Sequence, residues 1–386
     1  MRILHTSDWH LGKHLEMYSR LPEQEEFIGE LVEIVESRQV DLILIAGDVY
    51  DTANPPAEAE HLFYRSLLRL SDGGRRPVVV IAGNHDSPER LAAAGTLAAQ
   101  IGVFIIGLQR NFADGALELS LNGETAVILT MPYPSEKRLN EVFAGQNQQE
   151  ELQKSYSEKI GGMFTRLSEK YRDDTINLAM GHFYVRGGES SGSEREIQLG
   201  GSYAVDPAAL PSKAQYIAMG HLHRPQSVAG TKRAFYSGSP IQYSKSEIGY
   251  AKCVYLAEIH PGGEPEIEKI YLRNYKPVEV WKAQSVQDAL ELCERHAAEN
   301  TWVFMEIKTD KPLLPSEIKL MKSLKKDIVE ICPLLEAFGA DMLLEAEEEK
   351  SLEEEFRDFY QETRGAVPTE NLVSCFLSLS AGEDEL

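Results

Sequence analysis

The sequence predicts an α/β protein with a largely parallel sheet covered by helices, followed by a smaller α/β module. Short apolar runs rich in β-branched residues, typical of strands buried on both faces, recur along the chain. Stretches of helical periodicity separate the first of these runs, and this alternation is typical of parallel strands with helices on the faces of the sheet. With 386 residues and 42% apolar content, the chain can form one large core and a second, smaller one.

Five of the apolar runs end in a turn that carries Asp, Asn or His. Glycine stands at four of these strand ends, where it allows the backbone to turn tightly. Ligand sites of parallel sheets lie beyond the carboxyl ends of the strands, so we expect these polar residues to gather at one rim. The five stretches are MRILHTSDWH (1–10), DLILIAGDVYD (41–51), PVVVIAGNHD (77–86), TINLAMGH (175–182) and QYIAMGHLH (215–223).

Three helical patterns lie between the first strands and are expected to cover the sheet. Two of them begin with a proline, which suits the first turn of a helix, and the third has Ser87 as a candidate N-cap. They are PEQEEFIGELVEIVESR (22–38), PAEAEHLFYRSLLRL (56–70) and SPERLAAAGTLAAQI (87–101).

After about Tyr275 a second set of strands and helices begins, without any cluster of candidate ligands. We therefore expect a main domain at 1–275 and, at 276–386, a smaller domain with an acidic C-terminal region. A module of about 100 residues can hold its own core. Strands are expected at 276–283, 301–310 and 327–335, and helices at 285–300 and 315–327.

The polar residues at the strand ends form a candidate site for two metal ions. Seven nitrogen and oxygen donors, with no thiolate among them, exceed what one ion needs. Mixed imidazole and carboxylate donors suit Mn²⁺ or Fe²⁺, whereas sites made of oxygen alone suit Mg²⁺ better. One carboxylate, here Asp48, would bridge the two ions. The seven candidate ligands are Asp8, His10, Asp48, Asn84, His182, His221 and His223.

Each of these signals is weak by itself. A single His after a strand is more often an ordinary loop residue than a ligand, and the same holds for an isolated Asp-x-His pair. Five such turns in one chain, each following an apolar strand, favour a metal centre over a purely structural explanation.

In this order the motifs resemble those of the calcineurin-like metallophosphoesterases, and within that family most closely its DNA nucleases. The resemblance implies a four-layer α-β-β-α metallophosphoesterase sandwich followed by a small α/β capping domain. It also implies Mn²⁺-dependent cleavage of DNA, an ATPase partner of the SMC/Rad50-like type, and a homodimer that forms a heterotetramer with this ATPase. The stretches that carry the closer resemblance are DWHLGK (8–13), GDVYD (47–51), GHFYVRGGESSGSERE (181–196) and YSGSPIQYS (236–244).

The resemblance also implies a role for each site residue. The first metal would be bound by Asp8, His10, Asp48 and His223, and the second by Asp48, Asn84, His182 and His221. His85 stands where the family has a catalytic histidine, which could donate a proton to the leaving 3′-oxygen. Asp51 departs from archaeal relatives, which carry histidine there; it either orients His85 or supports the loop. Asp86 is expected to be structural, as a cap of the following helix.

The charge of the chain bears on its substrate. The formal net charge is −22, and residues 334–386 contribute −12 of it, from 15 acidic and 3 basic residues. This balance argues against broad, non-specific coating of DNA but leaves room for a local site. The Gly- and Ser-rich segment 186–202 is either a loop that shapes a groove over DNA or a plain linker. Five basic residues near the motifs are candidate phosphate contacts: Lys13, His14, Arg90, Arg224 and Lys245.

Two functions from different classes fit the sequence. The first is a DNA nuclease subunit that acts with an ATPase, and the second is a small-substrate phosphodiesterase or phosphatase with a protein-binding accessory domain. The four cysteines are scattered without metal-ligand spacing, the start is polar, and no apolar run could span a bilayer, which together favour a cytoplasmic protein. The helical segments 56–70 and 87–101 are expected to pair with their copies in a dimer. The acidic stretch 345–356 and the apolar stretch 372–379 are expected to dock onto the ATPase.

Overall fold

The computed structural model describes residues 1–108, 115–135, 155–194 and 204–335, together with 353, 356–357, 360–361 and 367–380. The chain divides into two compact units. The first comprises Met1–Ile307 and Leu313–Pro333, and the second Lys308–Pro312 and Leu334–Leu386. Within the described ranges, no helix has both the length and the apolar character needed to cross a bilayer.

The first six-stranded sheet contains three of the five predicted strands. Its strand order is β14-β13-β1-β4-β5-β6; the last four are parallel, and β13 and β14 are antiparallel additions at one edge. The strands are β1 (Arg2–Thr6), β4 (Leu42–Ala46), β5 (Val78–Ile81), β6 (Val103–Ile106), β13 (Cys253–Glu258) and β14 (Glu266–Tyr271).

The second six-stranded sheet contains the other two predicted strands, β9 and β10. Its order is β11-β12-β10-β9-β8-β7, with parallel pairing among the four central strands and an antiparallel strand at each edge. The predicted rim is therefore shared between two sheets. The strands are β7 (Ala116–Leu121), β8 (Glu124–Met131), β9 (Ile176–His182), β10 (Tyr216–Gly220), β11 (Gln226–Ser227) and β12 (Ala234–Tyr236).

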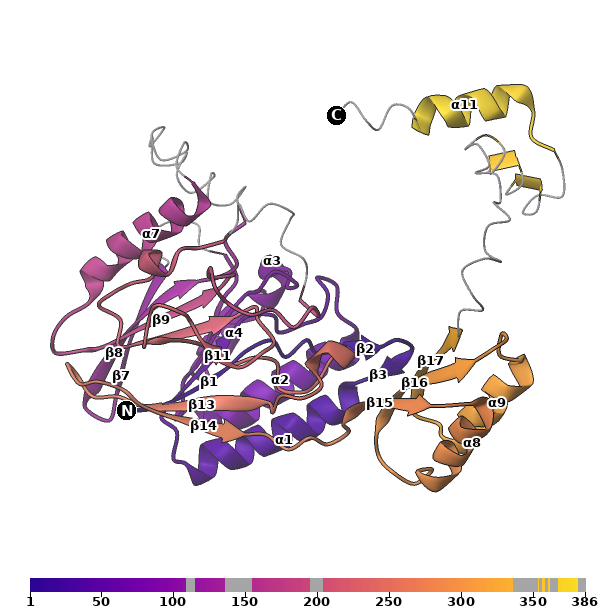
Figure 1. Ribbon diagram of the computed structural model, residues 1–386. Coiled ribbons are helices and arrows are strands. Elements are labelled where there is room, and N and C mark those ends of the chain that lie inside the picture. Colours follow the sequence, from indigo (N-terminus) through magenta and orange to yellow (C-terminus); the bar gives the residue numbers. More distant parts are fainter. Residues whose placement is uncertain are drawn as a thin grey trace. The chain divides into compact units, whose positions relative to one another are not determined.

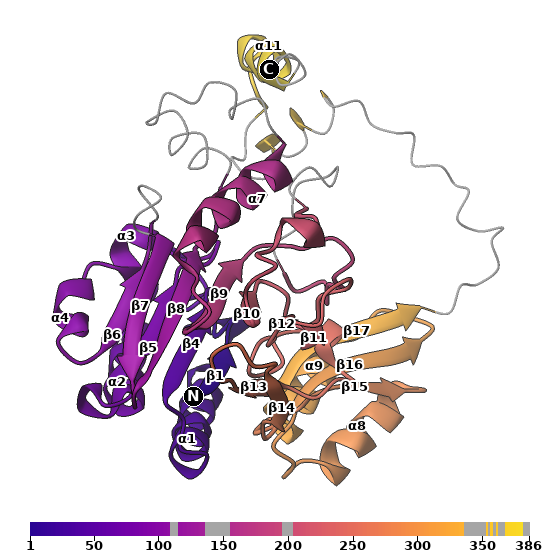
Figure 2. The same ribbon diagram turned by 90° about the vertical axis from the view of Figure 1, so that its left-hand side faces the viewer.

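The two sheets pack face to face with helices on both outer faces (Figures 1 and 2). Strand β4 shows how the sequence produces this arrangement: Leu42 and Leu44 belong to the core between the sheets, and Ile43 and Ile45 to the core beneath the outer helices. Buried residues of α1 (Leu21–Ser37) and α2 (Ala57–Ser71) complete that outer core, and α7 (Tyr156–Leu167) covers the second sheet. The predicted four-layer sandwich is confirmed.

The helix expected at 87–101 is not continuous. The segment forms two short helices, α3 (Pro88–Leu91) and α4 (Gly95–Ala99), because the chain turns at Ala92 and keeps both Leu91 and Ala98 in the core. Ser87 occupies the N-cap position of α3, but its side chain makes no capping hydrogen bond.

Four large apolar residues of the two segments expected to form the dimer contact lie in the core. Leu62, Phe63, Leu67 and Leu91 are at most 5% exposed and pack in the cluster beneath α1 and α2. The exposed large apolar residues of these helical segments are Leu68 and Leu97.

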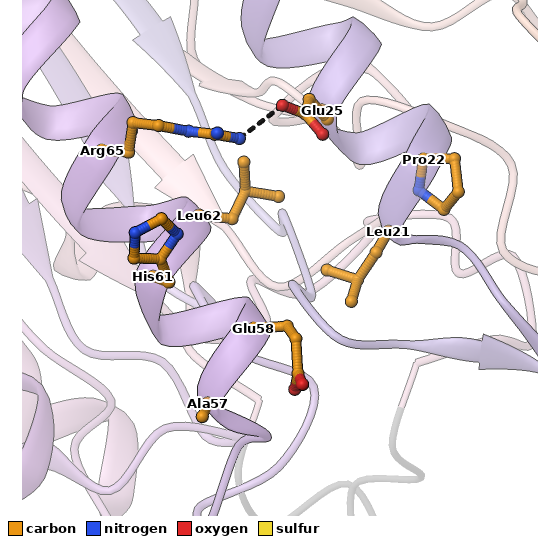
Figure 3. A pocket seen from close by; sticks show the side chains of 8 residues that line it. All are labelled: Leu21, Pro22, Glu25, Ala57, Glu58, His61, Leu62 and Arg65. Carbon is orange, nitrogen blue, oxygen red and sulfur yellow. Dashed lines mark hydrogen bonds and ion pairs between the residues drawn. The ribbon is translucent and has the colours of Figure 1, made fainter.

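A groove lies between α1 and α2 (Figure 3). Leu21 and Leu62 contribute apolar surface to it, and an ion pair joins Arg65 of α2 to Glu25 of α1. The groove contains none of the seven candidate metal ligands. Its lining residues are Leu21, Pro22, Glu25, Ala57, Glu58, His61, Leu62 and Arg65.

The predicted strands and helices after Tyr275 are all present. They form a three-stranded sheet in the order β15-β16-β17 with two helices and a separate small core. Two polar contacts tie this sheet to the start of the chain: Trp302 donates to Glu23 Oε1 over 2.6 Å, and the Tyr18 hydroxyl donates to the Ile328 carbonyl over 3.1 Å. The elements are β15 (Val278–Ala283), α8 (Val286–Arg295), β16 (Trp302–Thr309), α9 (Pro315–Leu324) and β17 (Ile328–Leu335).

Smaller elements complete the described structure. They are the hairpin of β2 (His14–Leu15) and β3 (Tyr18–Ser19), the 3-10 turns Asp72–Gly74, Ser168–Lys170, Pro207–Ala209 and Lys245–Glu247, and α11 (Glu370–Ser380) of the second unit. Within that unit, Phe376 of α11 stacks on Phe356 with ring centroids 4.1 Å apart. The predicted segment 345–356 lies almost entirely outside the described residues.

Candidate dimetal centre

The ends of five strands bring all seven candidate ligands to one rim. The turns after β1, β4 and β5 supply those from the first sheet, and β9 with the turn after β10 supplies those from the second. Six of the seven are at most 4% exposed, and Asn84 is half-buried. The rim is therefore a buried cluster of carboxylate, amide and imidazole groups.

The backbone at this rim is strained. Four non-glycine residues have φ in the left-handed region: Asp8 at 54°, His10 at 45°, Asp48 at 48° and His221 at 107°. Such conformations cost about 1–3 kcal/mol each and persist only where the surroundings impose them. All four are candidate ligands, and they make up half of the eight non-glycine residues with positive φ in the described part of the chain.

The glycines of the strand ends serve two different purposes. Gly47 has φ of 89°, and a tight turn does require glycine there. Gly83 and Gly220 lack a positive φ and are needed for close approach instead. A Cβ on Gly220 would lie 1.9 Å from the Ala46 carbonyl oxygen, and one on Gly83 would lie 2.1 Å from Asp48 Oδ1. The turn explanation therefore holds at Gly47, where a Cβ would also lie 2.3 Å from His182 Nδ1, and it is wrong at Gly83, Gly181 and Gly220, none of which has a positive φ.

One half of the rim is formed by Asp8, His10 and His223. Their ligand atoms lie within 4.8 Å of one another, and the Nε2 atoms of His10 and His223 are 3.0 Å apart. Asp48 Oδ2 lies 3.6 Å from His10 Nε2. Lone pairs of imidazole and carboxylate groups that face one another at this spacing suit a shared cation.

The other half is formed by Asn84, His182 and His221. Asn84 Oδ1 lies 3.0 Å from His182 Nε2 and 2.9 Å from His221 Nδ1. Asp48 Oδ2 lies 3.4 Å from His182 Nε2, so this one carboxylate oxygen contacts a histidine of each half. The position of Asp48 is the one that a bridging ligand requires.

Burial and mutual charge shift the pKa values of the cluster in opposite directions. Burial raises the pKa of Asp8 to about 6 and lowers that of His10 to about 4. Burial would also lower the pKa of His182, but Asp48 raises it to about 9. Conversely, burial would raise the pKa of Asp48, but His182 holds it well below its ordinary value. Buried carboxylate and imidazole groups therefore compete for protons here, as expected for donors that suit divalent cations.

The two halves differ in how their histidines are held. His182 Nδ1 donates to the backbone carbonyl of Ala46 over 2.8 Å. His223 Nδ1 instead lies 2.8 Å from Ser193 Oγ and 3.2 Å from Glu247 Oε1. Burial would raise the pKa of Glu247, but Lys252 and His223 hold it well below its ordinary value. Glu247, Lys252 and Ser193 were not among the predicted site residues; the signals that could have found them were the position of Ser193 inside the 181–196 motif and the closeness of Glu247 to the 236–244 motif.

His85 lies beside the cluster. Its backbone N–H donates to Asp48 Oδ1 over 2.9 Å, and its Nδ1 donates to the backbone carbonyl of Asp51 over 2.7 Å. The carboxylate of Asp51 lies 2.7 Å from Lys13 Nζ and 3.5 Å from His10 Nδ1, and it is also within 4.8 Å of a ring nitrogen of His85. The main chain of Asp51 therefore holds His85, while its side chain contacts Lys13 and His10.

Asp86 is structural, but it does not cap a helix. Its carboxylate accepts hydrogen bonds from the backbone N–H groups of Val49, Tyr50 and Gly83 at 2.8–3.1 Å. These bonds tie the turn after β4 to the turn after β5. The expected capping role is wrong because the carboxylate bonds to these three N–H groups, and the N-cap position of α3 is occupied by Ser87.

Four of the basic residues expected to contact phosphates are paired with acidic side chains. Arg90 pairs with Glu60, Arg224 with Glu189, Lys245 with Glu330 and Lys13 with Asp51. His14 is exposed and its Nδ1 lies 3.1 Å from the Gly12 carbonyl. Among the five, Lys13 is the one whose partner also contacts a candidate ligand.

Sequence comparison identifies the class to which this fold and rim belong. The model of the calcineurin-like phosphoesterase family matches residues 1–225. The chain belongs to this family, whose enzymes are metal-dependent phosphoesterases.

Relatives similar along most or all of the chain are more specific. The chain is 42% identical to the SbcD subunit of nuclease SbcCD from Bacillus subtilis (strain 168), over 100% of this chain and 99% of that one. It is 33% identical to the protein of that name from Rhodobacter capsulatus, over 81% of this chain and 82% of that one. It is 32% identical to the protein of that name from Escherichia coli K12, over 81% of this chain and 79% of that one. A dimetal phosphatase from Danio rerio has a TM-score of 0.40 at 13% identity over 69% of this chain and 98% of its own, too low a similarity to carry a conclusion.

Proposed function

We propose that this chain is a DNA nuclease subunit of the SbcCD type, which hydrolyses phosphodiester bonds with two Mn²⁺ ions. The observation that carries the proposal is the position of Asp48 between two clusters of buried donors, in a chain similar end to end to an SbcCD nuclease subunit. Duplex exonuclease and single-strand or hairpin endonuclease activities are the expected reactions, in DNA end processing, repair and recombination.

The residues present fit two ions. Asp8, His10, Asp48 and His223 would hold the first, and Asp48, Asn84, His182 and His221 the second. Bound ions would neutralise the non-bridging phosphate oxygens and lower the pKa of a water molecule. The mixture of imidazole and carboxylate donors favours Mn²⁺, with Fe²⁺ or Mg²⁺ as alternatives.

The protein's own groups supply the remaining chemistry. The Asp51 carbonyl accepts from His85 Nδ1, which leaves Nε2 as the nitrogen that exchanges a proton with the leaving 3′-oxygen. The hydrogen bond from the His85 backbone to Asp48 fixes this ring relative to the bridging carboxylate. Lys13, paired with Asp51 at the rim, would contact a phosphate of the bound strand.

The proposal extends to the domains and partners. Residues 1–275 would form the nuclease domain, and 276–386 the capping domain and acidic C-terminal region. An SbcC-type ATPase of the SMC/Rad50-like class would bind the second unit, and a homodimer would make the assembly a heterotetramer. Leu68 and Leu97, 59% and 77% exposed on α2 and α4, are large apolar residues that would be available for the dimer contact.

The decisive test is a cleavage assay with Mn²⁺ on labelled duplex, hairpin and single-stranded DNA, with and without the ATPase. A small chromogenic phosphodiester is assayed in parallel. Cleavage of DNA that the ATPase stimulates supports the proposal. Hydrolysis of the small ester with no cleavage of any DNA, even with the partner, would overturn it in favour of a small-substrate phosphodiesterase with a protein-binding accessory domain.

A further inference from the structure

We propose that Glu247, paired with Lys252, is a positioning residue that orients His223 toward the first metal ion. The inference deepens the proposed function, since it depends on His223 being a metal ligand. Glu247 is outside the predicted ligand set and follows the 236–244 motif by three residues. It ends a 3-10 turn, and its carboxylate is fully buried.

The two carboxylate oxygens of Glu247 contact different groups. Oε1 lies 3.2 Å from His223 Nδ1 and accepts from Ser193 Oγ over 2.6 Å. Oε2 accepts from Lys252 Nζ and, over 3.1 Å, from Ser239 Oγ. One oxygen therefore contacts the histidine ring, and the other holds the ammonium group that compensates the buried charge.

Lys252 is more than a counter-ion. Its Nζ, 6% exposed at the side chain, also donates to the His223 carbonyl over 3.0 Å and to Ser239 Oγ over 2.7 Å. On the opposite side, Glu194 Oε1 accepts from the His223 backbone N–H over 2.9 Å. The backbone and the ring of His223 are thus held by one connected network, in which Glu247 and Lys252 are buried and Ser193 and Glu194 are half-buried.

This network determines which ring nitrogen faces the metal. An Nδ1–H shared between Ser193 Oγ and Glu247 Oε1 leaves the Nε2 lone pair free on the side of His10, whose own Nε2 is 3.0 Å away. A carboxylate behind a metal-binding histidine fixes the tautomer and raises the basicity of the ligand, and its loss typically costs about 10–100-fold in metal affinity. Glu247 lies behind the ring of His223 in the same way.

A purely structural ion pair is the competing explanation, and it can be separated experimentally. Glu247→Gln alone would leave the buried Lys252 ammonium uncompensated and destabilise the protein. The informative variant is therefore Glu247→Met combined with Lys252→Met, since replacement of a buried ion pair by apolar residues is often neutral for stability. Glu30→Gln is the matched control, because Glu30 is a buried carboxylate that accepts from the Tyr275 hydroxyl over 2.8 Å, apart from the rim.

The experiment titrates Mn²⁺ into each metal-free protein, follows free Mn²⁺ by electron paramagnetic resonance, and records the melting temperature. We expect two bound ions in the wild type. In the double variant we expect one ion about 10–100-fold weaker and the other within about twofold. The same titration is repeated with Asn84→Ala added to remove the second metal site. Only the weakened first site should then be detected. Glu30→Gln should bind both ions normally.

Two outcomes overturn the inference, and they can be distinguished. If the double variant melts within a few degrees of the wild type and binds both ions with wild-type affinity, Glu247 has no positioning role while the metal assignment stands. If the folded wild type binds no Mn²⁺, the metal assignment itself fails. If the double variant does not fold, the proposal is tested on the metal-free wild type by the nitrogen-15 spectrum of the His223 ring. A hydrogen on Nε2 instead of Nδ1 in that spectrum would contradict the proposal.

Discussion

The two halves of the rim contain similar ligands but are supported in different ways. In the second half, His182 is the last residue of β9, and its ring is held by the main-chain carbonyl at the end of β4. In the first half, His223 lies beyond β10 and is held by the side chains of Ser193, Glu247 and Lys252. The histidine of one half is therefore held by the main chain at the strand ends, whereas that of the other half needs side chains from loops distant in sequence.

Because of this difference, the two metal sites should be sensitive to different kinds of mutation. A half that is held by main-chain groups of two sheets is sensitive to changes that move the sheets relative to each other. A half that is held by a side-chain network is sensitive to single polar substitutions that leave the fold intact. The two halves share Asp48, and the Asp8 carboxylate of the first half also accepts a hydrogen bond from the backbone N–H of His221 in the second half over 2.9 Å, so these two carboxylates should couple the halves.

The largest expected effect follows from changing the shared carboxylate. Asp48→Asn removes a negative charge that contacts His10 and His182, so both ions should bind weakly. Cleavage should fall by at least about 10³-fold, because metal ions contribute several kcal/mol of transition-state stabilisation. The measurements are Mn²⁺ stoichiometry and hydrolysis rate, with Asp173→Asn, at an exposed aspartate in the turn before β9, as the control. Two ions bound at wild-type affinity would refute the bridging role.

The next largest effect should leave metal binding in both halves of the rim intact and remove catalytic activity. His85→Gln leaves the seven ligands in place, so two Mn²⁺ should still bind, while cleavage falls by about 10²–10⁴-fold for loss of a proton-transfer group. His61→Gln, in the groove of Figure 3, is the matched control and should retain full activity. Wild-type turnover of the His85 variant would remove this residue from the mechanism.

A change that moves the sheets should affect mainly the second half. Gly220→Ala places a Cβ 1.9 Å from the Ala46 carbonyl and 2.8 Å from His182 Nδ1, so the hydrogen bond between them must distort. We expect a lower melting temperature and about tenfold or greater loss of affinity at one Mn²⁺ site. Gly29→Ala is the control, because nothing lies within 4 Å of its Cβ in α1 and alanine favours a helix by about 1 kcal/mol. Equal weakening of both ions would contradict the separate support of the two halves.

The same comparison explains how much could be predicted from the sequence. The seven donors stand directly at the ends of apolar runs, so strand periodicity alone brings them to a rim, and the structure does place them together. The sequence does not reveal that these strands belong to two sheets, because pairing depends on the whole chain. Glu247 and Lys252 have no such pattern: they lie in a loop and beside a strand, and long-range packing alone brings them against His223. The break between α3 and α4 was missed for a similar reason, since an alanine-rich segment has high helix propensity and tertiary packing overrides it.

The smallest expected effect tests the first half by removing a single hydroxyl. Ser193 Oγ lies between Glu247 Oε1 and His223 Nδ1, so Ser193→Ala removes one of the two oxygens near the ring nitrogen and keeps the carboxylate. Loss of one such hydrogen bond is worth about 1 kcal/mol, which corresponds to about fivefold weaker binding of one Mn²⁺. Ser323→Ala is the control and should change neither ion, because Ser323 is exposed on α9 and its hydroxyl donates to the Leu320 carbonyl of the same helix. The measurement is the same Mn²⁺ titration. A loss confined to the ion that Gly220→Ala leaves intact would show that each half depends on its own support. A loss at the ion that Gly220→Ala weakens would mean that the loop residues hold both halves together.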